Sequence, residues 1–112
     1  MTTYEKIVAA IAGYGWPYEP DIYTGRDSEH WWTYNYSADT GDLFADDVPG
    51  TNTVAVQVHL FMPRRESFSA LKQSVRFDLM AQGFTYPDVN VLVDEETGKT
   101  HLVFECEIDE EV

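Results

Sequence analysis

The sequence predicts an α+β fold, an antiparallel sheet of about four to five strands with two helices packed on one face. Two stretches place apolar residues at the three- and four-residue steps of a helix. Other stretches alternate apolar and polar residues, which is typical of strands with one buried face. The predicted order is helix, three strands, helix and hairpin, and this order favours α+β over a parallel α/β fold.

The first helix is predicted over residues 2–14. Thr2 and Glu5 have the spacing of a capping box, and a glycine- and proline-rich segment follows from Gly13. Its apolar stripe consists of Tyr4, Ile7, Val8 and Ile11. A short strand is predicted at residues 22–24, before a turn.

Residues 31–36 are dominated by aromatic residues and predict a strand. Alternation places Trp32, Tyr34 and Tyr36 on one face, where we expect them to pack, and Trp31 on the other. Residues 37–52 contain glycines, a proline and several aspartates, and are therefore predicted to be a long loop that only a neighbour orders.

The clearest strand covers residues 53–61, and a helix is predicted over residues 66–82. Residues 90–94 and 101–108 predict a hairpin, because the segment between them has turn chemistry. Residues 109–112 are expected to be a solvated acidic tail. The predicted core of this single domain, residues 1–112, contains Ile7, Ile11, Val54, Val56, Val58, Leu71, Val75, Leu79, Leu102 and Phe104.

Composition excludes several classes of protein. The chain has 112 residues and a net charge of −13, which argues against a general nucleic-acid binder. Its one cysteine, Cys106, allows no internal disulfide, and a reducing cytoplasm is the expected setting. No apolar run is long enough to span a bilayer, so neither an export signal nor a membrane partner is expected.

The chain contains no recognisable catalytic, metal-binding or cofactor motif, so we expect neither an enzyme nor a cofactor. His30, His59 and His101 follow no ligand spacing, although His59 and His101 become neighbours if their strands pair. The aspartates of residues 39–47 do not match a calcium loop. Cys106 lies on an apolar strand face, where a thiol is usually inert.

Charge is distributed unevenly along the chain. The predicted second helix and the turn before it carry four of the seven cations, whereas residues 37–47 carry four aspartates and no cation. A basic patch on one copy could therefore meet the acidic loop of the next, and a head-to-tail contact of this kind can close into a ring. The expected contact residues are Trp31, Asp39, Asp42, Phe44, Asp46, Asp47, Arg64, Arg65, Lys72 and Arg76.

Three stretches resemble the tail-completion proteins of long-tailed bacteriophages, the tail terminators that join tail to head. They are "WWTYNYSADTGDLFADD", "VAVQVHLFMPRRESFSALKQSVRFDLMAQGFTY" and "HLVFECEI", and the resemblance covers about residues 3–108. It implies a small α+β subunit that forms a ring, commonly a hexamer, capping the tail tube and meeting the head connector. It implies no catalytic residues, and a protein of the virion that is assembled in the bacterial cytoplasm.

Two other functions compete with this one. The charge of −13 suits an acidic mimic of DNA that blocks a host DNA-binding protein. Trp31, Trp32 and Tyr34 could form a platform for carbohydrate, although no export signal accompanies them.

Overall fold

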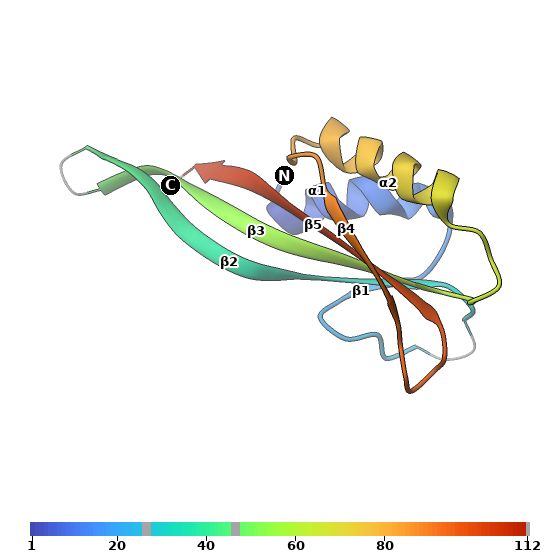
Figure 1. The fold of residues 1–112 in the computed structure, drawn as a ribbon. Coiled ribbons are helices and arrows are strands. Elements are labelled where there is room, and N and C mark those ends of the chain that lie inside the picture. The colour runs from blue at the N-terminus through green and yellow to red at the C-terminus, as the bar shows by residue number, and fades with distance from the viewer. Residues whose placement is uncertain (26–27, 46–47, 112) are drawn as a thin grey trace.

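The computed structural model describes residues 1–25, 28–45 and 48–111, with only the backbone described for 41–45 and 48–50. The predicted α+β class is confirmed: five strands form one mixed sheet, and two α-helices accompany it (Figure 1). The helical segments are α1 (Thr3–Ile11), η1 (Ala12–Tyr14) and α2 (Ser69–Ala81). The strands are β1 (Tyr18–Pro20), β2 (Trp31–Ala45), β3 (Val48–Met62), β4 (Asp88–Val93) and β5 (Thr100–Glu111).

The sheet has the strand order β1-β2-β3-β5-β4. Neighbours are antiparallel except β1, which runs parallel to β2, so the sheet is mixed rather than purely antiparallel. The strand predicted at residues 22–24 is wrong, because β1 lies earlier and Asp21 adopts a positive φ of 64° that turns the chain away.

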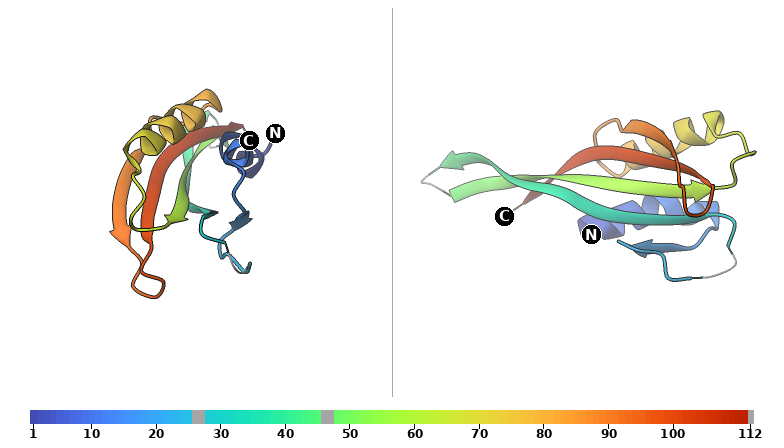
Figure 2. Two further views of the ribbon diagram at one scale, coloured as in Figure 1. Left: turned by 90° about the vertical axis from the view of Figure 1, so that its right-hand side faces the viewer. Right: turned by 60° about the horizontal axis from the view of Figure 1, so that its bottom comes forward.

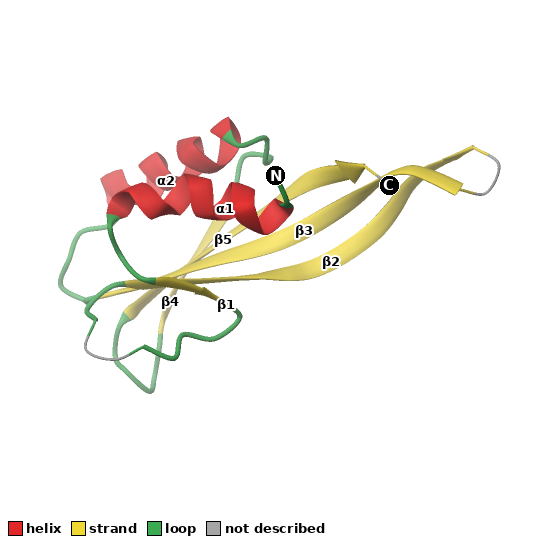
Figure 3. Ribbon diagram, turned by 180° about the vertical axis from the view of Figure 1, so that it is seen from behind, coloured by secondary structure: helices red, strands yellow, loops and turns green. Residues whose placement is uncertain are grey.

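The first helix begins where the sequence predicted. Thr2 and Glu5 form both hydrogen bonds of the capping box, and η1 continues α1 to Tyr14. The second helix begins later than predicted, at Ser69, because the Glu66 N–H donates to the Pro63 carbonyl in a turn. Figure 3 shows the two helices side by side against the sheet.

One core joins the helices to the sheet. Trp32, Leu60 and Phe104 are fully buried with Ile7 of α1 and Leu79 of α2. All predicted core residues are buried except Leu71, which is half-buried. The predicted packing face of β2 is confirmed for Trp32 and Tyr34, which are buried, whereas Tyr36 on the same face is 44% exposed. The alternate residues of β2, β3 and β5 form the opposite face, called here the open face.

The predicted loop at residues 37–52 is wrong, because these residues extend β2 and β3 into a long hairpin. The two strands pair as far as Ala45 and Val48, with a bulge at Ser37. The hairpin projects beyond the helices (Figure 2) and lengthens the molecule to 53 × 26 × 23 Å. Apolar residues between the aspartates, and pairing with an established strand, overcome the glycine and proline signals.

The acidic tail is also more ordered than predicted. Strand β5 continues to Glu111, and its residues pair with β3 as far as Thr51. The Glu110 carboxylate accepts hydrogen bonds from the Thr3 hydroxyl and, at 2.8 Å, from the Tyr36 phenol. The C-terminal strand is therefore tied to the start of α1 through Glu110, although Asp109 and Glu111 are exposed, as predicted.

Candidate functional site

The distal hairpin, residues 37–45 and 48–52, is called the arm. Strand β1 pairs with β2 only at residues 32–34, and β5 pairs with β3 from Thr51 onward. The outer edge of β2 beyond Tyr34 and the end of β3 before Thr51 therefore have no neighbouring strand among the described residues. A two-stranded ribbon is marginal by itself, and free strand edges are templates for pairing with another chain.

The acidic contact residues predicted from the sequence belong to this arm. Asp39 is exposed and pairs with Val54 across the hairpin. Asp42 and Phe44 lie on β2, where only the backbone is described, and Asp46 and Asp47 lie outside the described residues.

The four cations predicted as contacts lie elsewhere. Arg64 and Arg65 are exposed in the turn after β3, while Lys72 and Arg76 are half-buried on α2. Arg76 donates from Nε to the Pro87 carbonyl at 3.0 Å. Within the described parts of the chain none of the four forms an ion pair.

Figure 1 places the arm at one end of the long axis and the turn after β3 at the other. One chain therefore does not bring the basic turn and the acidic arm together. Their separation leaves both charges available for contacts with other molecules.

An apolar surface that the sequence interpretation missed lies along β4 and α2. Strand β4 is an edge strand, and its Val91, Leu92 and Val93 are each about half exposed, at 49, 49 and 55%. On α2, Phe77 and Met80 are also exposed. The stretch "VNVLV" indicates this surface, because its apolar residues lie on both faces of an edge strand and remain partly exposed there.

Trp31 already has partners within the chain. Its ring stacks between Tyr23, at 5.0 Å, and Phe61, at 5.2 Å, and Lys99 Nζ lies 5.3 Å from its centroid. Phe61 stacks in turn on His101 at 4.2 Å. The predicted contact residue is thus part of an aromatic row on the open face.

The predicted neighbourhood of His59 and His101 is confirmed, with Nδ1 of His59 2.8 Å from Nε2 of His101. His59 Nε2 also lies 2.9 Å from the side-chain oxygen of Asn35, whose amide nitrogen donates to Gln57. Because that oxygen can only accept, His59 carries its proton on Nε2, and its Nδ1 accepts from His101. Gln57 then donates to Glu105, so one chain of hydrogen bonds points along the open face toward a carboxylate.

The imidazoles of His59 and His101 are both neutral near pH 7. Burial, and then the neighbouring His101, lower the pKa of His59 to about 4. Burial also lowers the pKa of His101, although Asp94 opposes this shift. Protonation of His59 would leave two donors facing each other.

A row of carboxylates follows on the open face of β5. Its exposed members alternate with buried residues of the same strand and are Glu105, Glu107, Asp109 and Glu111. Residues two apart on a strand are about 6.7 Å apart. Gln57 donates to Glu105, and Thr53 donates to Asp109, so neighbouring β3 side chains orient part of the row.

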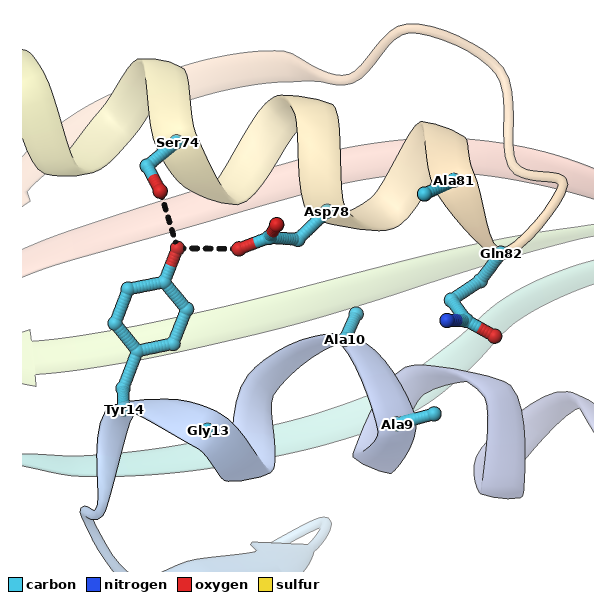
Figure 4. A pocket seen from close by; sticks show the side chains of 8 residues that line it. All are labelled: Ala9, Ala10, Gly13, Tyr14, Ser74, Asp78, Ala81 and Gln82. Atoms are coloured by element: carbon cyan, nitrogen blue, oxygen red, sulfur yellow. Dashed lines mark hydrogen bonds between the residues drawn. The ribbon is translucent and has the colours of Figure 1, made fainter.

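A groove of about 390 Å³ runs between α1 and α2 (Figure 4). The Tyr14 hydroxyl lies 2.7 Å from the Ser74 hydroxyl and donates to Asp78 at 2.5 Å. Burial, and then the hydrogen bond to Asp78, raise the pKa of Tyr14 to about 12, so the phenol keeps its proton. These groups tie η1 to α2.

Among the described residues, three side chains that could coordinate a metal ion lie close together, those of Glu29, His30 and Glu66. His30, left without a role by the sequence, lies 2.7 Å from Glu66. No pattern in the sequence predicts this cluster, because two connections far apart in the chain supply its residues.

No protein-family model matches the chain, and no curated protein matches it either. Among the described residues, no helix is both long enough and apolar enough to cross a membrane.

Proposed function

We propose that this chain is a non-enzymatic assembly protein of a bacteriophage virion, a tail-terminator-like subunit. Copies form a ring, the hexamer that the resemblance implies, which caps the tail tube and joins it to the head connector. The single observation that carries the proposal is the projecting β2–β3 arm, whose strand edges have no neighbour among the described residues.

Charge supports a head-to-tail arrangement of copies. The arm is acidic and the turn with Arg64 and Arg65 is basic, and the two lie at opposite ends of the long axis. Contacts between unlike surfaces generate rings when the rotation between copies closes. The apolar β4 edge adds a surface that a neighbouring copy would cover.

The open face would line the channel of the same ring. The carboxylate row of β5 suits the wall of a channel that DNA passes, since like charge keeps DNA from adhering. A variant with the row neutralised whose particles still pass DNA normally would contradict this part of the proposal.

Assembly is tested by light scattering over a range of protein and salt concentrations, with and without the tail-tube protein. We expect a closed oligomer that weakens as salt rises and that binds the tube protein. Arg64→Glu should weaken it, whereas Lys6→Glu, a matched charge change elsewhere, should do so less. A strict monomer that also fails to bind tube protein would overturn the proposal.

The carboxylate row also favours a second candidate, a mimic of DNA. Its spacing of about 6.7 Å is close to that of successive phosphates along one strand of a duplex. A mimic would compete with DNA for a host DNA-binding protein, and this competition would fall when Glu105, Glu107 and Asp109 become glutamines. Ring assembly with no such competition favours the first candidate.

A further inference from the structure

We propose that Glu29, His30 and Glu66 form a binding site for a divalent transition-metal ion, with Zn²⁺ as the best fit. Each side chain offers one ligand atom, and these atoms lie within 4.8 Å of one another. The site does not depend on ring assembly, so it can be tested on the protein in any oligomeric state.

Two connections bring the ligands together. His30 ends the segment before β2, and Glu66 lies in the turn between β3 and α2. His30 Nε2 is 2.7 Å from Glu66 Oε1. Bonds of about 2.0–2.1 Å in a tetrahedral site place ligand atoms about 3.3 Å apart. A small outward movement of Glu66, whose side chain is 41% exposed, would admit the ion between them.

The histidine is held in place by its surroundings. Its ring stacks on Trp16 with a centroid distance of 4.3 Å and an interplanar angle of 9°. Ser28 donates to the His30 carbonyl at 2.6 Å, and Lys99 donates to the Glu29 carbonyl at 3.1 Å. These contacts fix the ring and the backbone of two ligands, which lowers the entropy cost of binding.

The ligand chemistry selects the ion. One imidazole and two carboxylates give the three protein ligands of an open zinc site, with water in the fourth position. Mg²⁺ and Ca²⁺ prefer oxygen ligands alone, so the imidazole disfavours them. The net charge of −13 attracts cations, while Arg64 and Arg65 beside Glu66 oppose them, so we expect micromolar rather than tighter affinity.

Calorimetric titration of the untagged protein with ZnCl₂ tests the site, with MgCl₂ as the comparison. We expect one Zn²⁺ per chain and a Tm increase of about 5 °C or more at 100 times the dissociation constant. Glu29→Gln should weaken binding at least tenfold. In the described residues the Glu29 carboxylate makes no hydrogen bond or ion pair, so this variant should keep the fold. His30→Gln should abolish binding, and the matched control His101→Gln should leave it unchanged.

Three results would overturn the site. The first is the lack of both heat and a Tm change with 100 μM ZnCl₂. The second is Zn²⁺ binding by the Glu29→Gln and His30→Gln variants that equals binding by the unsubstituted protein. The contact between His30 and Glu66 would then be only a hydrogen bond between two connections. The third is loss of binding in His101→Gln, which would place the ion at the His59–His101 pair.

Discussion

Strands β2 and β3 run through two regions that are stabilised differently, the packed half of the molecule and the arm. In the packed half, β3 lies between β2 and β5, and its Val56, Val58 and Leu60 are fully buried under the helices. In the arm, β3 before Thr51 has only β2 beside it. The packed half can therefore stabilise itself, whereas the end of the arm has only the marginal stability of a two-stranded ribbon.

The largest expected effect is on the packed half. Phe104→Ala removes a fully buried ring from the core and should lower the free energy of unfolding by about 3–5 kcal/mol. Urea denaturation measures this loss. Phe77→Ala, on the exposed face of α2, is the matched control and should change stability by about 0.5 kcal/mol or less. Equal losses in the two variants would contradict the assignment of the core.

A second substitution tests association without disturbing the core. Leu92→Lys puts a charge on the half-exposed β4 edge and should weaken self-association at least tenfold, about 1.4 kcal/mol, while leaving the unfolding midpoint nearly unchanged. Sedimentation velocity measures the change. Asn90→Lys adds the same charge to the same strand face at a polar position, so a similar effect there would point to charge rather than to the apolar edge.

A third prediction concerns pH. The pKa of His59 is about 4 in the folded protein and about 6.5 when unfolded, so the unfolded state binds more protons between these values. Stability is therefore fully present above pH 6.5 and falls as pH drops toward 4. After allowance for solvent screening we expect a loss of about 1–2 kcal/mol.

Thermal unfolding at pH 7 and pH 4.5 measures this loss. His59→Gln keeps an amide donor toward Asn35 without the titration, and should reduce the difference between the two pH values. An unchanged difference would assign the effect to other groups.

The smallest expected effect is at the junction between the two regions. Tyr36→Phe removes the 2.8 Å hydrogen bond to Glu110 and should cost about 0.5–1.5 kcal/mol. Tyr86→Phe is the control and should cost less, because the Tyr86 hydroxyl accepts an exposed hydrogen bond from Gln73. Hydrogen exchange of the amides at the end of β5 would show whether the loss is local to this junction.

The spacing of apolar residues in the sequence predicted the packed half well, because burial in a shared core imposes that spacing. The alternation of Val54, Val56 and Val58 and the helical spacing of Val75 and Leu79 reflect one shared core. The arm lacks such a core, so its sequence resembles a loop even though its backbone is paired. The cluster of Glu29, His30 and Glu66 escaped prediction for a different reason, since His30 meets Glu66 only after the chain has folded. The His59–His101 pair was predictable, because strand pairing alone brings these two residues together.

The bulge at Ser37 has a consequence for how this protein can change. Before the bulge, even-numbered residues of β2 lie opposite even-numbered residues of β3, as Tyr36 does opposite Val56. After the bulge, odd-numbered residues of β2 lie opposite even-numbered residues of β3, as Asp39 does opposite Val54. The extra residue therefore changes which residues of β2 lie on each face of the sheet beyond the bulge, without altering the packed half. Regular pairing of the same residues would place Asp39 opposite Thr53, on the open side, whereas the bulge places it opposite Val54, on the helix side. One extra residue therefore sets which surface the acidic arm presents, and deleting Ser37 would remove the bulge while leaving Asp39 on the helix side.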